Sequence, residues 1–285
     1  MIPPKSPTPA RPSCARRHFT TDISREWADL LLILCYFITG MLDSASTSVW
    51  GSFVSMQTGN TVYIGLGLSV PGGSTRWIKS LTSLLSFCLG AFVFSRFHRH
   101  FSPARRWVLV TSCLAQFLLT AAAAAMVTRA SSSSSASNHT SNLFAAVDDR
   151  LAWDILLPIA LIAFQSAGQA VASRALKYPA LTSVVLTSVY CDLFSDPALF
   201  AGLLPTFSKE EGAVWGIGKN PDRNRRAAAP LALLLGAFAG GWLVREPLGV
   251  AAPLWAAAGI KVVVMVAWMV WPGVKEVREE GRLPA

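Results

Sequence analysis

The residues Leu30–Val49 read LLLILCYFITGMLDSASTSV, an apolar run of 20 positions whose one charged side chain is Asp43. A helix rises about 1.5 Å per residue, so a helix of this length crosses the roughly 30 Å hydrocarbon core of a bilayer. No water is present there to pair with backbone N–H and C=O groups, so a spanning segment has to satisfy them internally. The run therefore predicts a membrane-spanning α-helix.

Five further apolar runs of similar length follow it along the chain. They are Trp77–Phe97, Trp107–Val127, Leu151–Ala172, Ala227–Val244 and Val250–Trp271. Of the 285 residues 14% are charged, against about 25% in a typical soluble domain, and 52% are hydrophobic. This composition argues against a soluble helical protein and predicts an all-α, polytopic membrane bundle with about six transmembrane helices.

The net charge of +9 comes from basic residues that stand mostly between the apolar runs. Cytoplasmic loops of membrane proteins carry an excess of Lys and Arg, so we interpret this charge as a topology signal and not as a nucleic-acid surface. The tail 1–28 and the connection 96–106 are both basic, which predicts that both lie in the cytoplasm. An even number of spans must then separate them. The moderately apolar stretch 51–70 is therefore predicted not to cross, and the same argument applies to 180–204.

The sequence predicts three parts, with both termini in the cytoplasm of a plasma-membrane or endomembrane protein. They are a disordered basic tail at 1–28, a membrane domain at 29–271 and a C-terminal tail at 272–285. Within the membrane domain, a first repeat at 29–127 and a second at 151–271 flank a serine-rich outer loop at 128–150. In that loop, Asn138-His-Thr140 matches the N-glycosylation pattern, a weak signal that fits a non-cytoplasmic position.

The two halves of the membrane domain share short motifs in the same order. Asp43-Ser-Ala45 matches Gln165-Ser-Ala167, and Leu89-Gly-Ala-Phe92 matches Leu235-Gly-Ala-Phe238. Between these pairs, Met56-Gln-Thr-Gly-Asn-Thr61 corresponds to Leu186-Thr-Ser188. Three spans per half is an odd number, so the second half is predicted to be inverted. Inverted repeats with non-crossing, re-entrant segments recur in secondary transporters, with the binding site near the bilayer midplane.

At these residues the sequence resembles the YoaK-like family, the DUF1275 membrane proteins. The resemblance rests on Gly40-Met-Leu-Asp43, Thr58-Gly-Asn60, Gln165-Ser-Ala167 and Gly236-Ala-Phe238, and it covers roughly residues 29–271. The second copy departs from the Thr-Gly pattern, because it reads Thr187-Ser188-Val189. The family is described as membrane proteins of unknown function. The resemblance therefore implies a membrane class and no activity.

Two charged residues lie inside predicted spans. Asp43 lies past the middle of the first run, where a carboxylate is costly unless it is paired or hydrated. It either faces a cavity or partner, or it is a helix-end aspartate near the outer headgroups. Lys261 lies near the middle of the last run. It either pairs with Asp43 across a cavity or extends its amine toward a headgroup.

Several polar residues could bind a solute. The Gln57-Thr58-Gly59-Asn60 turn either lines a solute pathway or is an ordinary surface turn. Gln165 and Gln169 share a helix face, where they coordinate a solute or hydrogen-bond neighbouring helices. Thr187 and Asp192 belong to the second non-crossing segment; Asp192 shares a face with Asp196, and this pair lies either in the inner vestibule or at the cytoplasmic interface.

Motifs of catalysis are missing from the sequence, which contains no HExxH, Walker or GxSxG pattern. The five cysteines are scattered singly, so neither a disulfide framework nor a metal site is predicted, and no cofactor is expected. The leading hypothesis is a non-enzymatic secondary transporter or channel-like carrier of a small polar solute or ion. The alternatives are a non-transporting membrane scaffold or assembly factor, and a lipid-acting membrane enzyme. The lipid bilayer is the expected partner.

Overall fold

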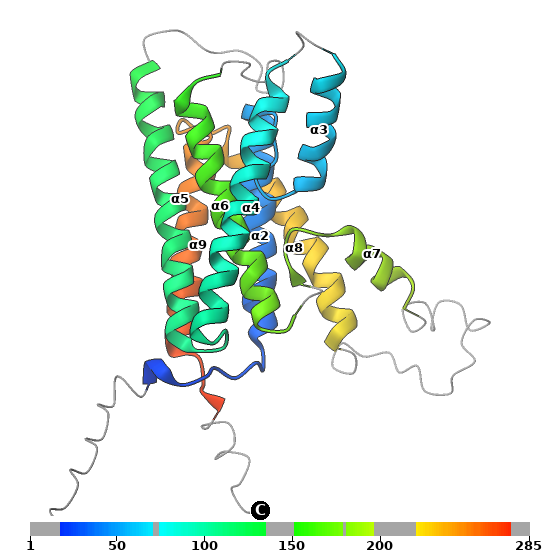
Figure 1. Ribbon diagram of the computed structural model, residues 1–285, viewed down its shortest axis with the longest axis vertical. Coiled ribbons are helices and arrows are strands. Elements are labelled where there is room, and N and C mark those ends of the chain that lie inside the picture. The colour runs from blue at the N-terminus through cyan, green and yellow to red at the C-terminus, as the bar shows by residue number, and fades with distance from the viewer. Residues whose placement is uncertain (1–17, 71–73, 135–150, 179–180, 197–220, 275–285) are drawn as a thin grey trace, which may run out of the picture.

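The computed structural model describes residues 18–70, 74–134, 151–178, 181–196 and 221–274, and nearly all of this part is helical (Figure 1). Six helices are long and apolar enough to cross a membrane, which confirms the expected number of spans. They are α2 (Ala28–Trp50), α4 (Arg76–Phe101), α5 (Arg106–Ser134), α6 (Trp153–Ala175), α8 (Pro221–Leu243) and α9 (Ala251–Val270).

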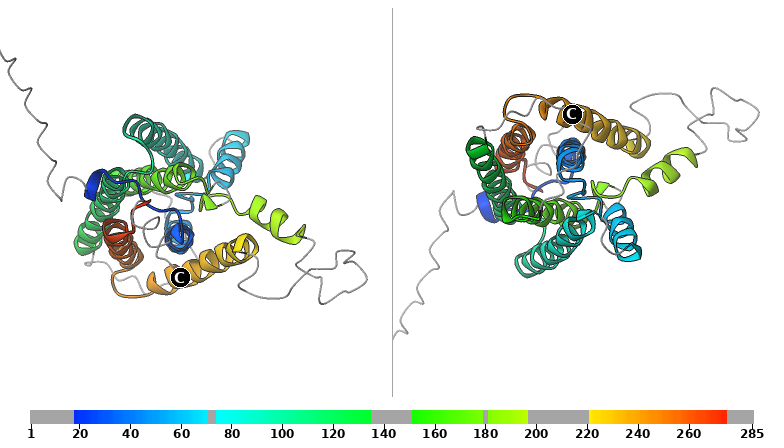
Figure 2. Two further views of the ribbon diagram at one scale, coloured as in Figure 1. Left: turned by 90° about the horizontal axis from the view of Figure 1, so that it is seen from below. Right: turned by 90° about the horizontal axis from the view of Figure 1, so that it is seen from above.

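Two short helices occupy the segments that were predicted not to cross. They are α3 (Gln57–Ser69) and α7 (Thr187–Phe194), with 13 and 8 residues. At about 1.5 Å per residue they extend over roughly 20 and 12 Å, which is too short for the hydrocarbon core. The two helices lie toward opposite ends of the bundle, and α7 projects away from it (Figures 1 and 2).

Glycines let the main helix pairs of the bundle approach closely. Helix α2 packs along α8, and α4 packs along α6. A Cβ on Gly236 of α8 would overlap the Phe37 carbonyl of α2, and one on Gly40 of α2 would overlap the Leu233 carbonyl of α8. In the second pair, a Cβ on Gly90 would overlap the Phe164 carbonyl. Small residues at such crossings provide the backbone contact that holds membrane helices together.

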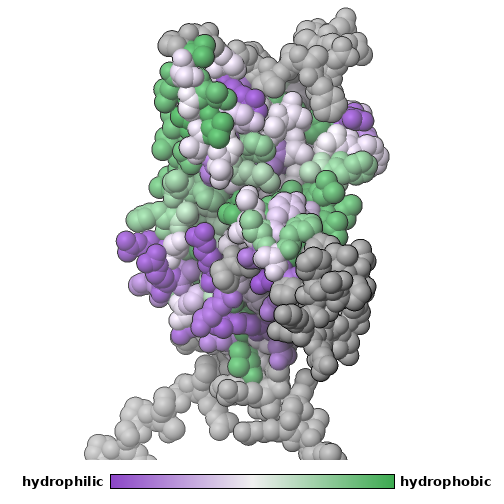
Figure 3. Space-filling view, turned by 90° about the vertical axis from the view of Figure 1, so that its right-hand side faces the viewer, coloured by the Kyte–Doolittle hydropathy of each residue, from purple (hydrophilic) through white to green (hydrophobic). Residues whose placement is uncertain are grey.

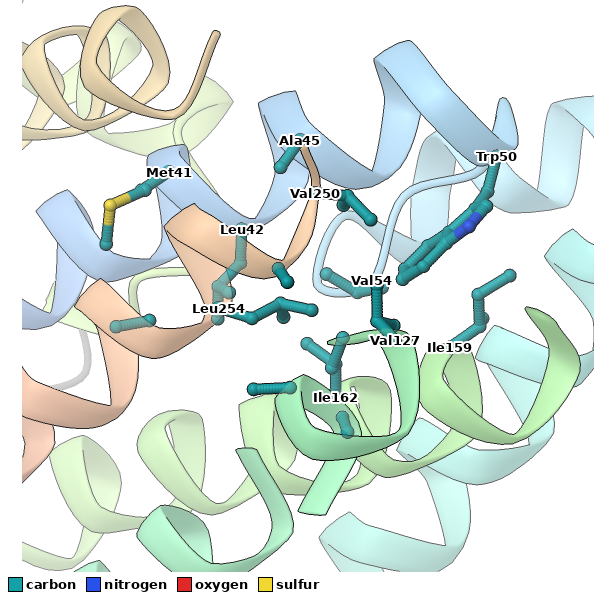
Figure 4. Close-up of a cluster of buried hydrophobic side chains, with 14 of the residues drawn as sticks. Met41, Leu42, Ala45, Trp50, Val54, Val127, Ile159, Ile162, Val250 and Leu254 are labelled. Carbon is teal, nitrogen blue, oxygen red and sulfur yellow. The ribbon is translucent and has the colours of Figure 1, made fainter. Parts of the chain in front are cut away.

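The interior contains two apolar clusters, one toward each end of the bundle. The distal cluster, far from the termini, is built on Ile38, Met41, Leu42, Ala45, Trp50, Val54, Ala123, Ala124, Val127, Ile155, Ile159, Ile162, Val244, Val250, Ala251, Leu254 and Ala257 (Figure 4). The proximal cluster, beside the termini, is built on Ile23, Ala28, Leu32, Tyr36, Leu109, Val110, Leu176, Leu181, Ala229, Val264 and Trp268. Both draw residues from α2, α5 and α9, so these three helices contribute to the apolar packing at both ends of the bundle.

The outer surface of the bundle is apolar, as a bilayer requires. On α8 the exposed side chains include Leu231, Leu234, Phe238 and Trp242. Figure 3 shows hydrophobic residues over the upper and middle parts of one face, with hydrophilic residues gathered below them, at the end that carries both termini. An apolar patch of this extent would be unfavourable in water. The chain is therefore an integral membrane protein.

At the proximal end, three segments far apart in sequence join in what we name the terminal clasp, residues 21–24, 104–106 and 271–274. The backbone N–H of Ile23 donates to Ala104 O at 3.0 Å, and that of Ser24 donates to Pro272 O at 2.9 Å. The buried guanidinium of Arg106 donates to the carbonyls of His18 and Trp271. Residues 18–28, assigned from sequence to the N-terminal tail, thus make ordered contacts; residues 1–17 and 275–285 lie outside the described part.

Candidate functional site

Asp43 anchors the connection between α2 and α3. Its Oδ1 accepts hydrogen bonds from the backbone N–H groups of Val54 at 2.8 Å and Ser55 at 2.9 Å, and the Ser55 hydroxyl donates to Oδ2. The residue is 3% exposed. A carboxylate accepts several hydrogen bonds at once, so one side chain can satisfy a whole turn of buried backbone. The expected ion pair of Asp43 with Lys261 is wrong, because each of these residues has other partners.

Asn60 binds the same connection through a second set of hydrogen bonds, the Asn60 clamp. Its Oδ1 accepts from the backbone N–H of Phe53 at 3.0 Å, and its Nδ2 donates to Phe53 O at 2.8 Å. Nδ2 also lies 2.9 Å from Gln57 Oε1 and 3.1 Å from Ser83 Oγ of α4. The buried amide therefore joins the connection, α3 and α4.

Of the other two residues of the Thr-Gly-Asn signature, Gly59 packs against a ring and Thr58 is exposed. Residues 57–60 form the first turn of α3, which corrects the expectation of an irregular turn. A Cβ on Gly59 would lie 2.7 Å from the Phe53 ring, so glycine makes room for that ring. Thr58 is exposed. Gly59 and Asn60 thus shape the connection, and a role of Thr58 in solute binding stays a prediction.

Replacing Asn60 by alanine should lower the free energy of unfolding by about 1 to 3 kcal/mol, because the Phe53 N–H loses its side-chain acceptor and Phe53 O keeps only the Ser83 hydroxyl. Thermal unfolding of detergent-purified protein, followed by tryptophan fluorescence, measures the change. Thr58→Ala, two residues away and exposed, is the matched control and should unfold like the native chain. Equal losses for both variants would contradict the Asn60 clamp.

A polar layer lies near the middle of the bundle, centred on Lys261 of α9. The Lys261 ammonium donates to Gln116 Oε1 at 3.0 Å and to Gln169 Oε1 at 2.5 Å. These two glutamines belong to α5 and α6, and all three residues are 3–4% exposed. The sequence hypothesis that Gln169 and Lys261 share one site is therefore consistent with the structure, while a headgroup-directed lysine is not.

A second ring of polar groups holds the two glutamines. Gln169 Nε2 donates to Thr39 Oγ1 at 3.2 Å and to Cys35 O at 3.3 Å, both on α2. Gln116 Nε2 donates to Ser112 Oγ at 3.3 Å. We name Thr39, Ser112, Gln116, Gln169 and Lys261 the lysine layer. It connects α2, α5, α6 and α9 through side chains alone.

Gln165 lies one helical turn from Gln169 on α6 and is fully buried. Its Nε2 donates to Ser166 Oγ at 3.1 Å, while its Oε1 has no hydrogen-bond partner. A buried amide oxygen without a partner costs about 1–3 kcal/mol. It therefore offers an acceptor beside the lysine layer.

The lysine layer is enclosed by the two apolar clusters. Along α9, Leu254 and Ala257 of the distal cluster precede Lys261, and Val264 and Trp268 of the proximal cluster follow it. Along α5 the order is reversed, because Leu109 of the proximal cluster precedes Gln116 and Ala123 of the distal cluster follows it. The layer is thus separated from both bundle ends by apolar side chains.

The remaining predicted site residues lie elsewhere. Thr187 and Asp192 are exposed on α7, which packs against α8, whereas α3 packs against α4, so the structure does not pack the two non-crossing helices against each other. Asn138 lies outside the described residues. Two surface cavities, of about 190 and 440 Å³, are lined by residues such as Tyr63 and Trp77 in one case and Asp22 and Val274 in the other. Neither reaches Asp43 or Thr58.

Sequence reasoning missed Gln116, Thr39 and Ser112 as members of the site. Gln116 carries the best signal, because an amide near the middle of an apolar span is costly unless it has a partner. Thr39 and Ser112 carry little signal, since hydroxyls in membrane helices commonly bond their own backbone. In the part of the chain that the structure describes, no group of three or more His, Cys, Asp or Glu is arranged to hold a metal ion.

Comparison with protein families gives one match that covers most of the chain. The profile of the family described as "Protein of unknown function (DUF1275)" matches residues 31–267. The matched range begins in α2 and ends in α9, so it includes Asp43, the Asn60 clamp and the lysine layer. The searches of curated proteins and of solved structures returned no match.

Proposed function

The chain belongs to the DUF1275 family of proteins of unknown function, and from its geometry we propose that it is a secondary transporter or channel-like carrier of a small polar solute or ion. The observation that carries the proposal is the lysine layer, a buried polar site midway along four spans with apolar side chains above and below it. A membrane protein that serves only as a scaffold has no need for an ammonium group at this depth.

The energetic argument rests on what burial of the layer costs. A charged side chain at the bilayer centre costs about 2.5–3.5 kcal/mol on insertion scales, and such residues usually mark a substrate or ion pathway. Here the ammonium is solvated by two amide oxygens, at 3.0 and 2.5 Å. The two glutamine amides already replace water around the ammonium. The same polar groups can therefore also form hydrogen bonds to a polar solute that enters the site. This is the chemistry that a midplane binding site requires.

Helix pairing supports the inverted repeat that alternating access would use. In an inverted repeat, α2, α3, α4 and α5 of the first half correspond to α6, α7, α8 and α9 of the second. The α2–α8 pair then corresponds to α6–α4, and the α3–α4 pair corresponds to α7–α8. The α5–α9 pair corresponds to itself. Each of these pairs packs together. Gln116 and Lys261 stand at matching places, since each lies ten residues after the first residue of its helix, Arg106 or Ala251 (116 − 106 and 261 − 251). Their hydrogen bond joins the two halves.

The glycine contacts show which residues of the two halves of the repeat correspond to each other. Gly90 and Gly236, which the sequence motifs pair, approach the carbonyls of Phe164 and Phe37. This aligns Phe37 with Phe164, and by the same offset Asp43 with Ala170 (164 − 37 = 170 − 43). In this register Asp43 aligns with Ala170 and not with Gln165, so the motif match of Asp43-Ser-Ala45 with Gln165-Ser-Ala167 disagrees with the helix packing. We therefore assign its anchoring role to the first half alone.

Orientation follows from the charges. Both termini leave the bundle at the proximal end, where hydrophilic residues gather (Figures 1 and 3). By the excess of basic residues in the tail and in the connection 96–106, we propose that this end faces the cytoplasm.

Osmotic swelling of proteoliposomes tests the transport proposal without a labelled substrate. Stopped-flow light scattering follows entry of urea, glycerol, alanine, potassium chloride and potassium formate, with valinomycin to compensate charge. We expect at least one of them to enter faster than into protein-free liposomes. Gln169→Leu should slow that entry at least tenfold, because it removes a Lys261 acceptor and the link to Thr39.

Ser188→Leu serves as the control, because it makes a polar-to-leucine change on the exposed face of α7, away from the layer. Its entry rate, normalised to folded protein, should equal the native rate. If no solute in the panel enters faster than into protein-free liposomes, the transporter proposal fails. The hypothesis of a non-transporting scaffold is then favoured.

A further inference from the structure

Lys261 has no carboxylate among its described partners. Its hydrogen-bond acceptors are two neutral amides, and the titratable groups that act on it electrostatically are the thiols of Cys35 and Cys113. A free thiol has a pKa near 8.5 and is mainly uncharged at pH 7. The charge of the ammonium is thus solvated but not neutralised by the described part of the chain.

The two aspartates of α2, which is one of the helices of the lysine layer, already have partners. Asp43 of α2 is bound by the backbone and hydroxyl of the α2–α3 connection. Asp29, at the start of α2, pairs with Arg225 of α8 at 2.8 Å. Breaking either arrangement to reach Lys261 would leave buried donors or a cation without a partner. The described part of the chain therefore offers Lys261 no countercharge, and an anion from solution can supply one.

The layer can change from an empty to an anion-holding arrangement by rotation of two side-chain amides. The terminal torsion of glutamine is broad and roughly two-fold, so an amide can exchange its oxygen and nitrogen positions. After such a rotation, Nε2 of Gln116 and Gln169 would point at the space beside Lys261. A hydroxyl both donates and accepts, so Ser112 and Thr39 would donate to the rotated oxygens as they now accept from the nitrogens, while Gln169 would give up its longer bond to Cys35 O.

We infer that the lysine layer binds a small monovalent anion, inorganic or the carboxylate of a small solute. The two amide oxygens that accept from the Lys261 ammonium, at 3.0 and 2.5 Å, stand where an anion would accept instead. A bound anion neutralises the buried charge, so the loaded site crosses the bilayer interior at lower electrostatic cost than the empty one. This inference names the substrate class of the proposed transporter and rests on that function for its transport part.

The flux experiment uses the full chain in liposomes with valinomycin. Entry of potassium chloride tests an inorganic anion, entry of potassium formate tests a carboxylate, and urea is the uncharged comparison. Lys261→Met keeps the length of the side chain and removes its charge. The variant leaves the Gln116 and Gln169 oxygens without their lysine donor, so entry rates are normalised to the amount of folded, monodisperse protein. We expect it to slow anion entry at least tenfold.

Lys177→Met is the matched control, because the same substitution is made at an exposed lysine after α6. It should leave anion entry at the native rate. Protein-dependent urea entry that survives Lys261→Met, with no lysine-dependent anion entry, would overturn the inference and leave the transporter proposal standing.

A binding measurement separates the site from transport. In detergent, chloride or formate at saturating concentration should raise the Tm of the native protein and not that of Lys261→Met, because a ligand that binds the folded state alone stabilises it. A lysine-dependent rise without any flux supports the anion site and overturns transport. Equal Tm changes in both proteins, together with lysine-independent flux, overturn the anion site.

Discussion

Replacing Asp43 by alanine should remove about 4 kcal/mol of stability and lower the Tm in detergent by about 10 °C. The carboxylate accepts from two backbone N–H groups and a hydroxyl in a place that is 3% exposed. Without it, the N–H groups of Val54 and Ser55 are buried with no acceptor, and each such donor costs about 1–3 kcal/mol. Thermal unfolding of purified protein measures the loss.

Two further aspartate variants make this prediction specific. Asp43→Asn keeps a carbonyl oxygen that can accept from both N–H groups, so about half of the loss is expected. Asp192→Ala removes an exposed aspartate on α7 and should stay within about 0.5 kcal/mol of the native value. An Asp43→Ala protein as stable as the native chain would show that other contacts hold the α2–α3 connection.

Replacing Gly236 by alanine should separate α2 from α8 and lower the yield of folded, monodisperse protein severalfold. The added Cβ would overlap the Phe37 carbonyl, a backbone atom that cannot rotate away. Overpacking of this kind costs about 1–3 kcal/mol, and the affected contact is the longest helix pairing in the bundle. Size-exclusion chromatography of the detergent extract measures the yield.

Gly241→Ala is the control for this variant, because a Cβ at Gly241 meets nothing within 4 Å. Alanine is the better helix former by about 1 kcal/mol, so this variant should be equal to or slightly more stable than the native protein. The two substitutions are five positions apart on one helix and are chemically identical. Similar losses in both would mean that the close approach of α2 and α8 does not depend on glycine.

The six spans were predictable because a bilayer imposes one length on every crossing helix. Runs such as Leu30–Val49 and Val250–Trp271 have that length and few charges, and both became spans. The stretches 51–70 and 180–204 were assigned as non-crossing from charge alone, and the short helices α3 and α7 fit that assignment. Part of the second stretch, residues 180 and 197–204, lies outside the described residues.

The site was only partly predictable, because side-chain partners depend on how helices are rotated about their axes. Asp43 and Lys261 were noticed as buried charges, but their pairing was wrong. The carboxylate bonds with residues only 11 and 12 positions later, and closing so short a loop costs little entropy. Gln116, which does contact Lys261, is 145 positions from it, and no local pattern connects the two.

The terminal clasp has a consequence for how the protein is made. The N–H of Ser24 donates to Pro272 O at 2.9 Å, and these two residues lie near the two ends of the described part of the chain. The ribosome therefore adds Ser24 early and Pro272 late. The clasp can therefore close only after α9 has left the ribosome and entered the bilayer. Until then the carbonyls of His18 and Trp271 are not both in place for Arg106. The clasp is thus a late contact in synthesis, and a chain cut before Trp271 would leave Arg106 without one of its two carbonyl acceptors.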